Sequence, residues 1–216
     1  MENDKRFRVA LALAFAAMAA VTLLSYGSLP ERMAIHWGFE GEPNGYAGKL
    51  FGALSIPVIS LFVAALLLFL PRLDPLHGID RFRKDYNNFV LGIIGFLLYM
   101  QLLVIAANTG FSFDFGQLLA PGFGALFFII GGVFEKSKRN WFAGIRTPWT
   151  LSSDAVWEKT HVLGAKMFKA SGVIAFLGIL LPGAALWLLI IPVIASAICL
   201  VVYSYLEYAK EQKREK

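Results

Sequence analysis

The feature that most constrains this chain is a series of six apolar runs, none of which contains a charged residue. The runs span residues 9–26, 50–70, 89–109, 117–134, 170–181 and 184–206. Most approach the roughly 20 residues that an α-helix needs to cross the hydrocarbon core of a bilayer. With 57% hydrophobic and only 16% charged residues, the chain is too apolar for a soluble domain or a disordered segment. We therefore predict an all-α integral membrane protein with six transmembrane helices.

Two of these runs differ from a simple span. The fifth is short, but Ser152 or Ser153 can cap a helix that begins near Asp154, so this helix should extend beyond the bilayer on one side. The first run contains Ala17-Met18-Ala19, which resembles a signal cleavage site. Because its apolar stretch continues to Leu24, we expect it to be retained as a span.

The basic residues are distributed unevenly between the two sides that six spans define. Of the 20 Lys and Arg residues, all but Arg32 and Lys49 fall in the two terminal tails and in the second and fourth loops. The positive-inside rule predicts that both termini are cytoplasmic in a multi-pass protein of the cell membrane. Contact with membrane lipid accounts for this inner positive charge, and we expect no direct contact with nucleic acid.

The first outer loop is too long for a simple connection. Its segment Pro43-Asn44-Gly45 is typical of a turn, because proline restricts φ whereas Asn and Gly tolerate positive φ. His36, Trp37 and Tyr46 offer aromatic and hydrogen-bonding groups for recognition. Trp37 and Tyr46 are equally typical of the aromatic belt that anchors helices at a membrane interface, so recognition and anchoring both remain open.

The fourth loop combines polar and aromatic residues at 146–150, directly before the long fifth helix. On that helix, Trp157 and His161 are spaced i and i+4 and therefore share one face. This pattern predicts a small packed cap at the cytoplasmic end.

The same helix also suggests a metal site. Asp154, Glu158 and His161 are spaced i, i+4 and i+7, which places all three on one face. A carboxylate and a histidine three residues apart also occur in helical carboxylate metal sites. The metal-site hypothesis competes with the packed cap for His161.

The interior of the predicted bundle lacks Asp, Glu, Lys, Arg and His deep in any run. Intramembrane ionisable residues usually mark ion or proton pathways, so a proton-coupled transporter or pump is disfavoured. Gln101 and Asn108, seven residues apart on the third span, indicate hydrogen bonding between helices. A stripe that lines a substrate path is the alternative.

The two polar loops carry a family resemblance. The segments Leu29-Pro30, His36-Trp37, Gly41-Glu42-Pro43 and Gly45-Tyr46 to Lys49 resemble the N-terminal module of unknown function found in SdpI-type membrane proteins. The segment Gly144 to Leu151, followed by Trp157 and Thr160-His161, resembles the C-terminal SdpI signature. The resemblance implies an N-terminal two-helix module at 1–88 with a structured outer loop at 29–49. It also implies a C-terminal four-helix module at 89–216 with a cytoplasmic loop at 135–166.

The resemblance further implies an immunity and signalling protein rather than an enzyme, with no cofactor. The family's namesake protects a bacterium from its own secreted peptide toxin and holds a transcriptional repressor at the membrane. By position, the outer loop becomes a candidate toxin-facing surface, with the residues His36, Trp37, Gly41, Glu42, Pro43, Gly45, Tyr46 and Lys49. The inner loop becomes a candidate repressor-facing surface, with the residues Gly144, Arg146, Thr147, Pro148, Trp149, Thr150, Trp157 and His161.

Two other functions are kept as alternatives. A small-molecule or lipid transporter would use Gln101, Asn108 and helices kinked at proline. A metal-dependent membrane enzyme would use Asp154, Glu158 and His161. The enzyme ranks last, because the sequence has neither a nucleophile elbow nor a phosphate-binding loop.

Overall fold

The structure is a computed structural model that describes residues 2–39, 41–181 and 183–214. Six of its helices are long and apolar enough to cross a membrane, which confirms the predicted fold class. These helices are α1 (Glu2–Ser25), α2 (Lys49–Leu73), α3 (Arg83–Asn108), α4 (Phe115–Lys136), α6 (Asp154–Phe176) and α7 (Ala185–Arg214). Shorter helical segments are η1 (Tyr26–Ser28), η2 (Ile79–Phe82), α5 (Pro148–Ser152) and η3 (Leu177–Leu180).

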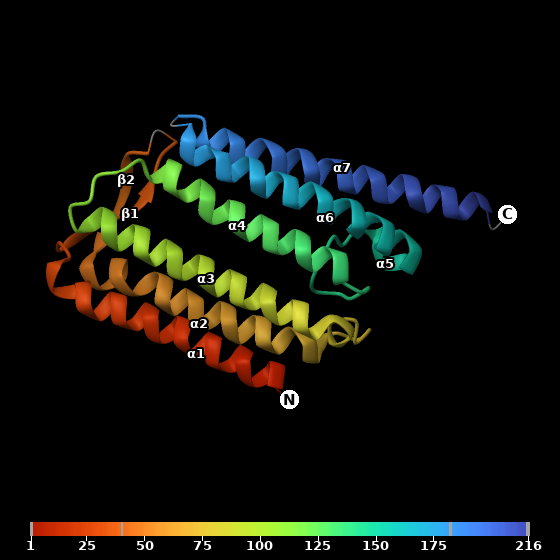
Figure 1. Ribbon diagram of the computed structural model, residues 1–216, viewed down its shortest axis with the longest axis horizontal. Helices are drawn as coiled ribbons and strands as arrows, with labels where there is room; N and C mark the ends of the chain where they lie inside the picture. Colours follow the sequence, from red (N-terminus) through yellow and green to blue (C-terminus); the bar gives the residue numbers. More distant parts are fainter. Residues whose placement is uncertain (1, 40, 182, 215–216) are drawn as a thin grey trace.

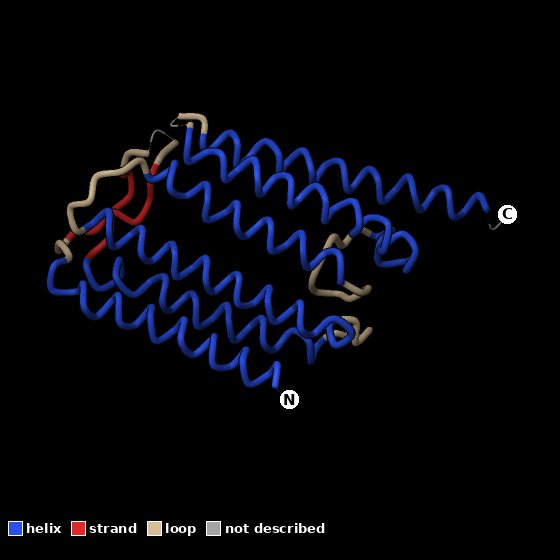
Figure 2. The backbone as a smooth tube through the Cα atoms, viewed as in Figure 1, coloured by secondary structure: helices blue, strands red, loops and turns tan. Residues whose placement is uncertain are grey.

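The long helices run side by side, with α1, α2 and α3 in one group and α4, α6 and α7 in the other (Figure 1). Helix α3 contacts α1, α2 and α4, so it joins the two groups. Both ends of the chain lie at one end of the bundle, which we call the termini end; a small β-hairpin lies at the opposite, hairpin end (Figure 2). The boundary predicted between residues 88 and 89 falls inside α3 and stays a prediction.

Helices α4 and α6 form the most extensive contact in the bundle, and small residues make it close. A Cβ atom on Gly124 would lie 2.7 Å from the carbonyl oxygen of Gly172, and a Cβ on Gly131 would lie 2.8 Å from that of Ala165. Such separations allow only glycine, so the two backbones approach each other directly. Small residues support helix packing in membranes in this way, because lipid removes the usual hydrophobic driving force.

Helix α6 begins where the sequence predicts. The Ser153 side chain accepts a hydrogen bond from the backbone N–H of Val156 and caps the helix, which starts at Asp154. Capping satisfies one of the N–H groups that a helix start leaves without a partner.

The loop between α1 and α2 contains an antiparallel hairpin of β1 (Arg32–Trp37) and β2 (Pro43–Gly48), which the sequence analysis did not predict. The register shifts between Ala34 and His36 and again between His36 and Trp37. Only Met33 and Ala34 of β1 are fully buried. Strand β1 therefore lacks the alternation of buried apolar and exposed polar residues by which a strand is predicted.

Candidate functional site

The hairpin is fastened to the bundle by an amide side chain of α3. The Asn108 Oδ1 accepts a hydrogen bond from the backbone N–H of Ala34 at 2.7 Å, and its Nδ2 donates to the Ala34 carbonyl at 2.9 Å. Nδ2 also donates to the Val104 carbonyl at 2.8 Å. The side chain thus satisfies both polar backbone groups of a buried strand residue. This contact supports the structural interpretation of Asn108 over a substrate stripe.

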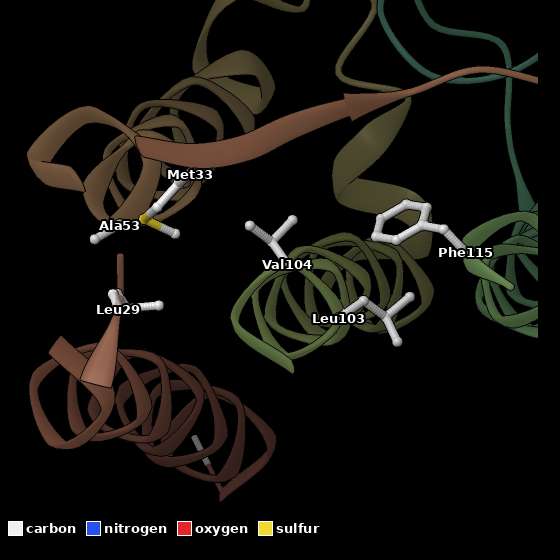
Figure 3. Close-up of a cluster of buried hydrophobic side chains, with 6 residues drawn as sticks. All are labelled: Leu29, Met33, Ala53, Leu103, Val104 and Phe115. Atoms are coloured by element: carbon white, nitrogen blue, oxygen red, sulfur yellow. The ribbon is translucent and has the colours of Figure 1, made fainter. Parts of the chain in front are cut away.

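Apolar side chains from several elements meet beneath the hairpin (Figure 3). Met33 is completely buried and packs against Gly52 of α2, where a Cβ atom would lie 2.8 Å from its sulfur. The cluster comprises Leu29, Met33, Ala53, Leu103, Val104 and Phe115. The hairpin therefore rests on a core shared by α2, α3 and α4, and its position is set by that core.

Trp37 and Tyr46 have different surroundings. The Trp37 indole stacks on Phe115 at the start of α4, with ring centroids 3.8 Å apart and an interplanar angle of 5°. Tyr46 is 47% exposed, and the guanidinium of Arg32 lies 4.8 Å from its ring centroid. Trp37 is thus held by protein, whereas Tyr46 remains on the surface.

A groove of about 800 Å³ opens beside this stack. Its walls come from β1, the hairpin turn, α3, α4 and the start of α7, and they are almost entirely apolar. The polar groups at its edge are His36 and Asn44, which are joined by a hydrogen bond of 2.5 Å between Nδ1 and Oδ1. A concave apolar site with a few polar groups at one end is typical of a ligand site.

Of the eight outer-loop residues implied by the resemblance, His36 and Trp37 line this groove. The others shape the hairpin or its surface. Gly41 has a φ of 80° and forms the turn. Gly45 lies so close to His36 that a Cβ atom would be 2.8 Å from the His36 Cβ. Lys49 pairs with Glu31 at 3.5 Å. The remaining three, Glu42, Pro43 and Tyr46, are exposed.

At the termini end, His161 organises the loop between α4 and α6. Its Nε2 accepts a hydrogen bond from the backbone N–H of Ile145 at 2.9 Å. Its Nδ1 must then carry the proton, which it donates to the Trp157 carbonyl at 2.8 Å. The imidazole ring of His161 also stacks on the indole ring of Trp157, with ring centroids 4.0 Å apart. Gly144 has a φ of 123°, and a Cβ there would lie 2.5 Å from the His161 Nε2.

The residues after Ile145 form a capped turn at α5. Thr147 and Thr150 make a reciprocal capping box, with Pro148 in the first turn, where its missing N–H costs nothing. The Thr147 hydroxyl also lies 3.0 Å from the Ser204 hydroxyl of α7, and both are buried. The cap thus links the loop to the last helix.

The side of this capped turn that faces away from the bundle is a surface with aromatic and basic groups. Trp149 packs against Tyr205 of α7, with ring centroids 5.1 Å apart. Arg146 is exposed and donates to the Trp141 carbonyl at 2.8 Å, and the Trp141 side chain is itself 50% exposed. Trp157 and His161 are buried, so they support this surface from below and are not part of it.

The geometry gives no support to the predicted metal site, because its three side chains do not converge. Both ring nitrogens of His161 are already used within the protein. Asp154 is 79% exposed at its side chain and pairs with Arg139 at 2.8 Å, and Glu158 is exposed. Within the described ranges, no three His, Cys, Asp or Glu side chains form a group that would hold a metal ion.

Gln101 has a structural environment as well. It is completely buried in α3, and its Nε2 donates to the Thr22 hydroxyl at 2.9 Å and to the Ala53 carbonyl at 3.0 Å. These bonds join α3 to α1 and α2, as expected for a polar side chain between membrane helices. These contacts support the structural interpretation of Gln101 over a substrate stripe.

Two residues that hold the termini-end loops together were missed by the sequence analysis. The Asp74 carboxylate accepts hydrogen bonds from the backbone N–H groups of Gly78 at 2.7 Å and Trp141 at 3.2 Å. Asn140 is completely buried, and its Oδ1 accepts from the backbone N–H of Ala143 at 2.6 Å. Both are turn-forming residue types, and the residue type alone does not indicate which distant N–H groups such a side chain binds.

Comparison with known proteins adds a family context. Residues 136–204 match the model of the SdpI/YfhL protein family, and residues 13–61 match a domain of unknown function, DUF1648. The chain is 24% identical over 191 residues to the "Immunity protein SdpI" of Bacillus subtilis (strain 168), which covers 88% of this chain and 89% of that protein. No solved structure matches the chain significantly.

Proposed function

The chain belongs to the SdpI-type family of integral membrane proteins, and from this premise we propose that it is an immunity protein against a secreted peptide toxin. The observation that carries the proposal is the apolar groove under the hairpin, which His36 and Trp37 line. A toxin that acts on membranes is expected to be apolar, and this groove offers it an apolar surface with polar groups at the edge. The role is one of binding and not of catalysis.

The proposal requires the hairpin end to face outward. Both termini lie at the other end, where most Lys and Arg residues also lie, and the positive-inside rule favours a cytoplasmic location for that end. The proposed location is the cell membrane. To test the orientation, the single cysteine is first removed by Cys199→Ala. One new cysteine is then added at either end of the bundle, by Tyr46→Cys or by Lys138→Cys. A membrane-impermeant maleimide should label only the Tyr46→Cys protein in intact cells, and the reverse pattern would contradict the orientation.

Protection is tested by expressing the full chain in toxin-sensitive cells. The sensitive cells are a Bacillus subtilis strain that lacks its own immunity protein. They are challenged with culture medium from the strain that encodes the chain and, separately, with medium that contains the Bacillus subtilis toxin. We expect survival with the intact chain and loss of survival with Trp37→Ala. Trp141→Ala, which removes an exposed indole at the termini end, is the matched control. Death of cells in both media, despite normal amounts of folded protein in the membrane, would refute the function.

A signalling role at the cytoplasmic end is the finer part of the proposal. It is supported by the exposed side chains of Trp141 and Arg146 and the half-buried Trp149 beside them. The hydrogen bond between His161 and the Ile145 N–H holds this loop in place. Such a surface suits a transcriptional repressor that carries acidic side chains. We expect a fluorescent fusion of the winged-helix regulator encoded nearest to the gene to move to the membrane after exposure to toxin. Arg146→Ala should abolish this movement while protection persists, and Lys138→Ala should leave both intact.

A further inference from the structure

A second, polar groove lies between α1 and α3 at the termini end, and it shares no lining residue with the groove under the hairpin. Its volume is about 440 Å³. Helix α1 contributes Asp4, Arg6 and Phe7, and α3 contributes Arg83 and Lys84, with Asn87 beside them. Three of these side chains are cationic and one is anionic, so the lining has a net positive charge. At this level of the bundle, where the apolar runs end, a basic groove faces the phosphate groups of the adjacent leaflet.

Asn87 gives this groove an unmet hydrogen-bonding requirement. The residue is only 7% exposed, and its Oδ1 has no hydrogen-bond partner within residues 2–39, 41–181 and 183–214. A buried polar atom without a partner costs free energy, and one in a native protein indicates a missing donor. Because the amide can flip without a change of shape, the side chain can present either an acceptor or donors to the groove.

The polar groove continues into an apolar one. Asn88 and Leu91 line both, and the second groove, of about 640 Å³, extends along α3 past Gly92 and Gly95 to the contact with α4. Lys84, Asn88, Leu91 and Gly95 are spaced i, i+4, i+7 and i+11, so one face of α3 carries the charge and the apolar channel in succession. A Cβ atom on Gly95 would meet nothing within 4 Å, which leaves this channel open.

We propose that these joined grooves are a binding site for one anionic phospholipid whose headgroup carries a hydroxyl, as in phosphatidylglycerol. The phosphate lies near Lys84 and Arg83, a headgroup hydroxyl donates to Asn87, and one acyl chain follows the glycine-lined groove along α3. Lys84 makes no ion pair with any described residue, whereas Arg83 is 3.5 Å from Asp80. Lys84 is therefore the cation that a lipid phosphate neutralises. The site is independent of toxin binding.

The test measures which lipids stay bound to the full-length protein. The protein is reconstituted in vesicles of equal parts phosphatidylglycerol and phosphatidylcholine, extracted in mild detergent, and weighed by native mass spectrometry. We expect phosphatidylglycerol to be enriched over phosphatidylcholine. Lys84→Gln should lower that enrichment about fivefold, the effect expected of one basic residue near a membrane surface. Lys138→Gln, which removes an exposed cation at the same end, should leave it unchanged.

The acyl-chain groove is tested by a variant that fills it. Gly95→Leu should reduce retention of both lipids without changing their ratio, whereas Gly132→Leu, at a glycine that also has open space around it, should have no effect. Thermal unfolding of each variant shows whether it is folded. Equal retention of the two lipids by the intact protein, or equal losses in the control variants, would overturn the proposal.

Two further probes define the headgroup. Phosphatidylmethanol is a phosphodiester with the same single charge but without the glycerol hydroxyls, so the intact protein should prefer phosphatidylglycerol to it, and Asn87→Leu should remove that preference. Equal retention of both lipids by the intact protein would overturn the assignment of the hydroxyl. Soluble glycerol phosphate should not displace the bound lipid, and displacement would indicate a site for a free phosphate ester.

Discussion

Asn108 binds both backbone polar groups of Ala34, with distances of 2.7 Å from the Ala34 N–H and 2.9 Å to its carbonyl. A side-chain amide here takes the place of a neighbouring strand, because it offers a donor and an acceptor with the spacing of a peptide group. The hairpin needs this substitute, since among the described residues β1 pairs with β2 alone. Through this pair, the end of α3 determines where the hairpin sits above the apolar groove.

The first prediction concerns this pair. Asn108→Leu leaves the buried N–H and carbonyl of Ala34 without partners, and we expect a loss of about 1–3 kcal/mol in stability. Thermal unfolding in detergent measures the loss, and limited proteolysis reports release of the hairpin. Asn88→Leu replaces an exposed asparagine on the same helix and should change neither. Equal stability of the two variants would show that the pair contributes nothing.

Gly144 provides a second prediction. Its φ of 123° is rarely adopted by residues with a side chain, and a Cβ atom would collide with His161 and Trp157. We expect Gly144→Ala to destabilise the protein by about 1–3 kcal/mol, the usual range for such backbone strain. Gly132→Ala lies in open space inside α4 and should be neutral or gain up to about 1 kcal/mol. A neutral Gly144→Ala would contradict the tight contact with His161.

His161 can be tested by a change that preserves ring stacking. His161→Phe removes the acceptor for the Ile145 N–H and the donor to the Trp157 carbonyl. We expect faster hydrogen exchange at the Ile145 amide and an unfolding free energy lower by about 1–3 kcal/mol. His77→Asn, at an exposed residue with a φ of 47° that Asn tolerates, is the control. Unchanged exchange at Ile145 would count against this network.

No group of metal ligands converges on His161 in the described part of the chain, and this leads to a prediction about metal binding. Because both ring nitrogens are already hydrogen-bonded, added Zn²⁺ should not raise the unfolding temperature, and a chelator should not lower it. Differential scanning fluorimetry of the purified protein measures both. A rise with Zn²⁺ that disappears in His161→Phe would restore the metal hypothesis.

Thr147 links the capped turn at α5 to α7. A double-mutant cycle with Ser204 separates the free energy of this link from that of the helix cap. Thr147→Val removes the cap of α5 and the contact with Ser204. We expect a loss of about 0.5–2 kcal/mol, the usual effect of a missing helix cap. Ser204→Ala alone should cost less, since Thr147 keeps its capping bonds. If the double variant loses as much stability as the two single variants together, the contact between the Thr147 and Ser204 hydroxyls contributes no measurable free energy.

The helices were predictable because their signal is local. Each span is a continuous apolar segment, and Ser153 lies next to the helix it caps, so neighbouring residues contain the information. The hairpin was not predictable in this way. Its register shifts at Ile35, and its burial comes from Met33 packing on Gly52 and from Asn108, which are distant in sequence. The metal hypothesis found no support in the geometry, because helical spacing shows which residues share a face and not what surrounds them.

The sequence by itself determined that the chain spans a membrane with six helices, because crossing hydrocarbon requires a length of apolar helix that can be counted. It also indicated which two loops carry polar and aromatic residues. Only the tertiary structure decided what these residues do. It made the buried His161 and the half-buried Asn108 into hydrogen-bonding supports, left His36 and Trp37 at a groove, and brought α1 beside Lys84 and Asn87. These outcomes depend on contacts between distant segments, and such contacts arise only when the helices pack.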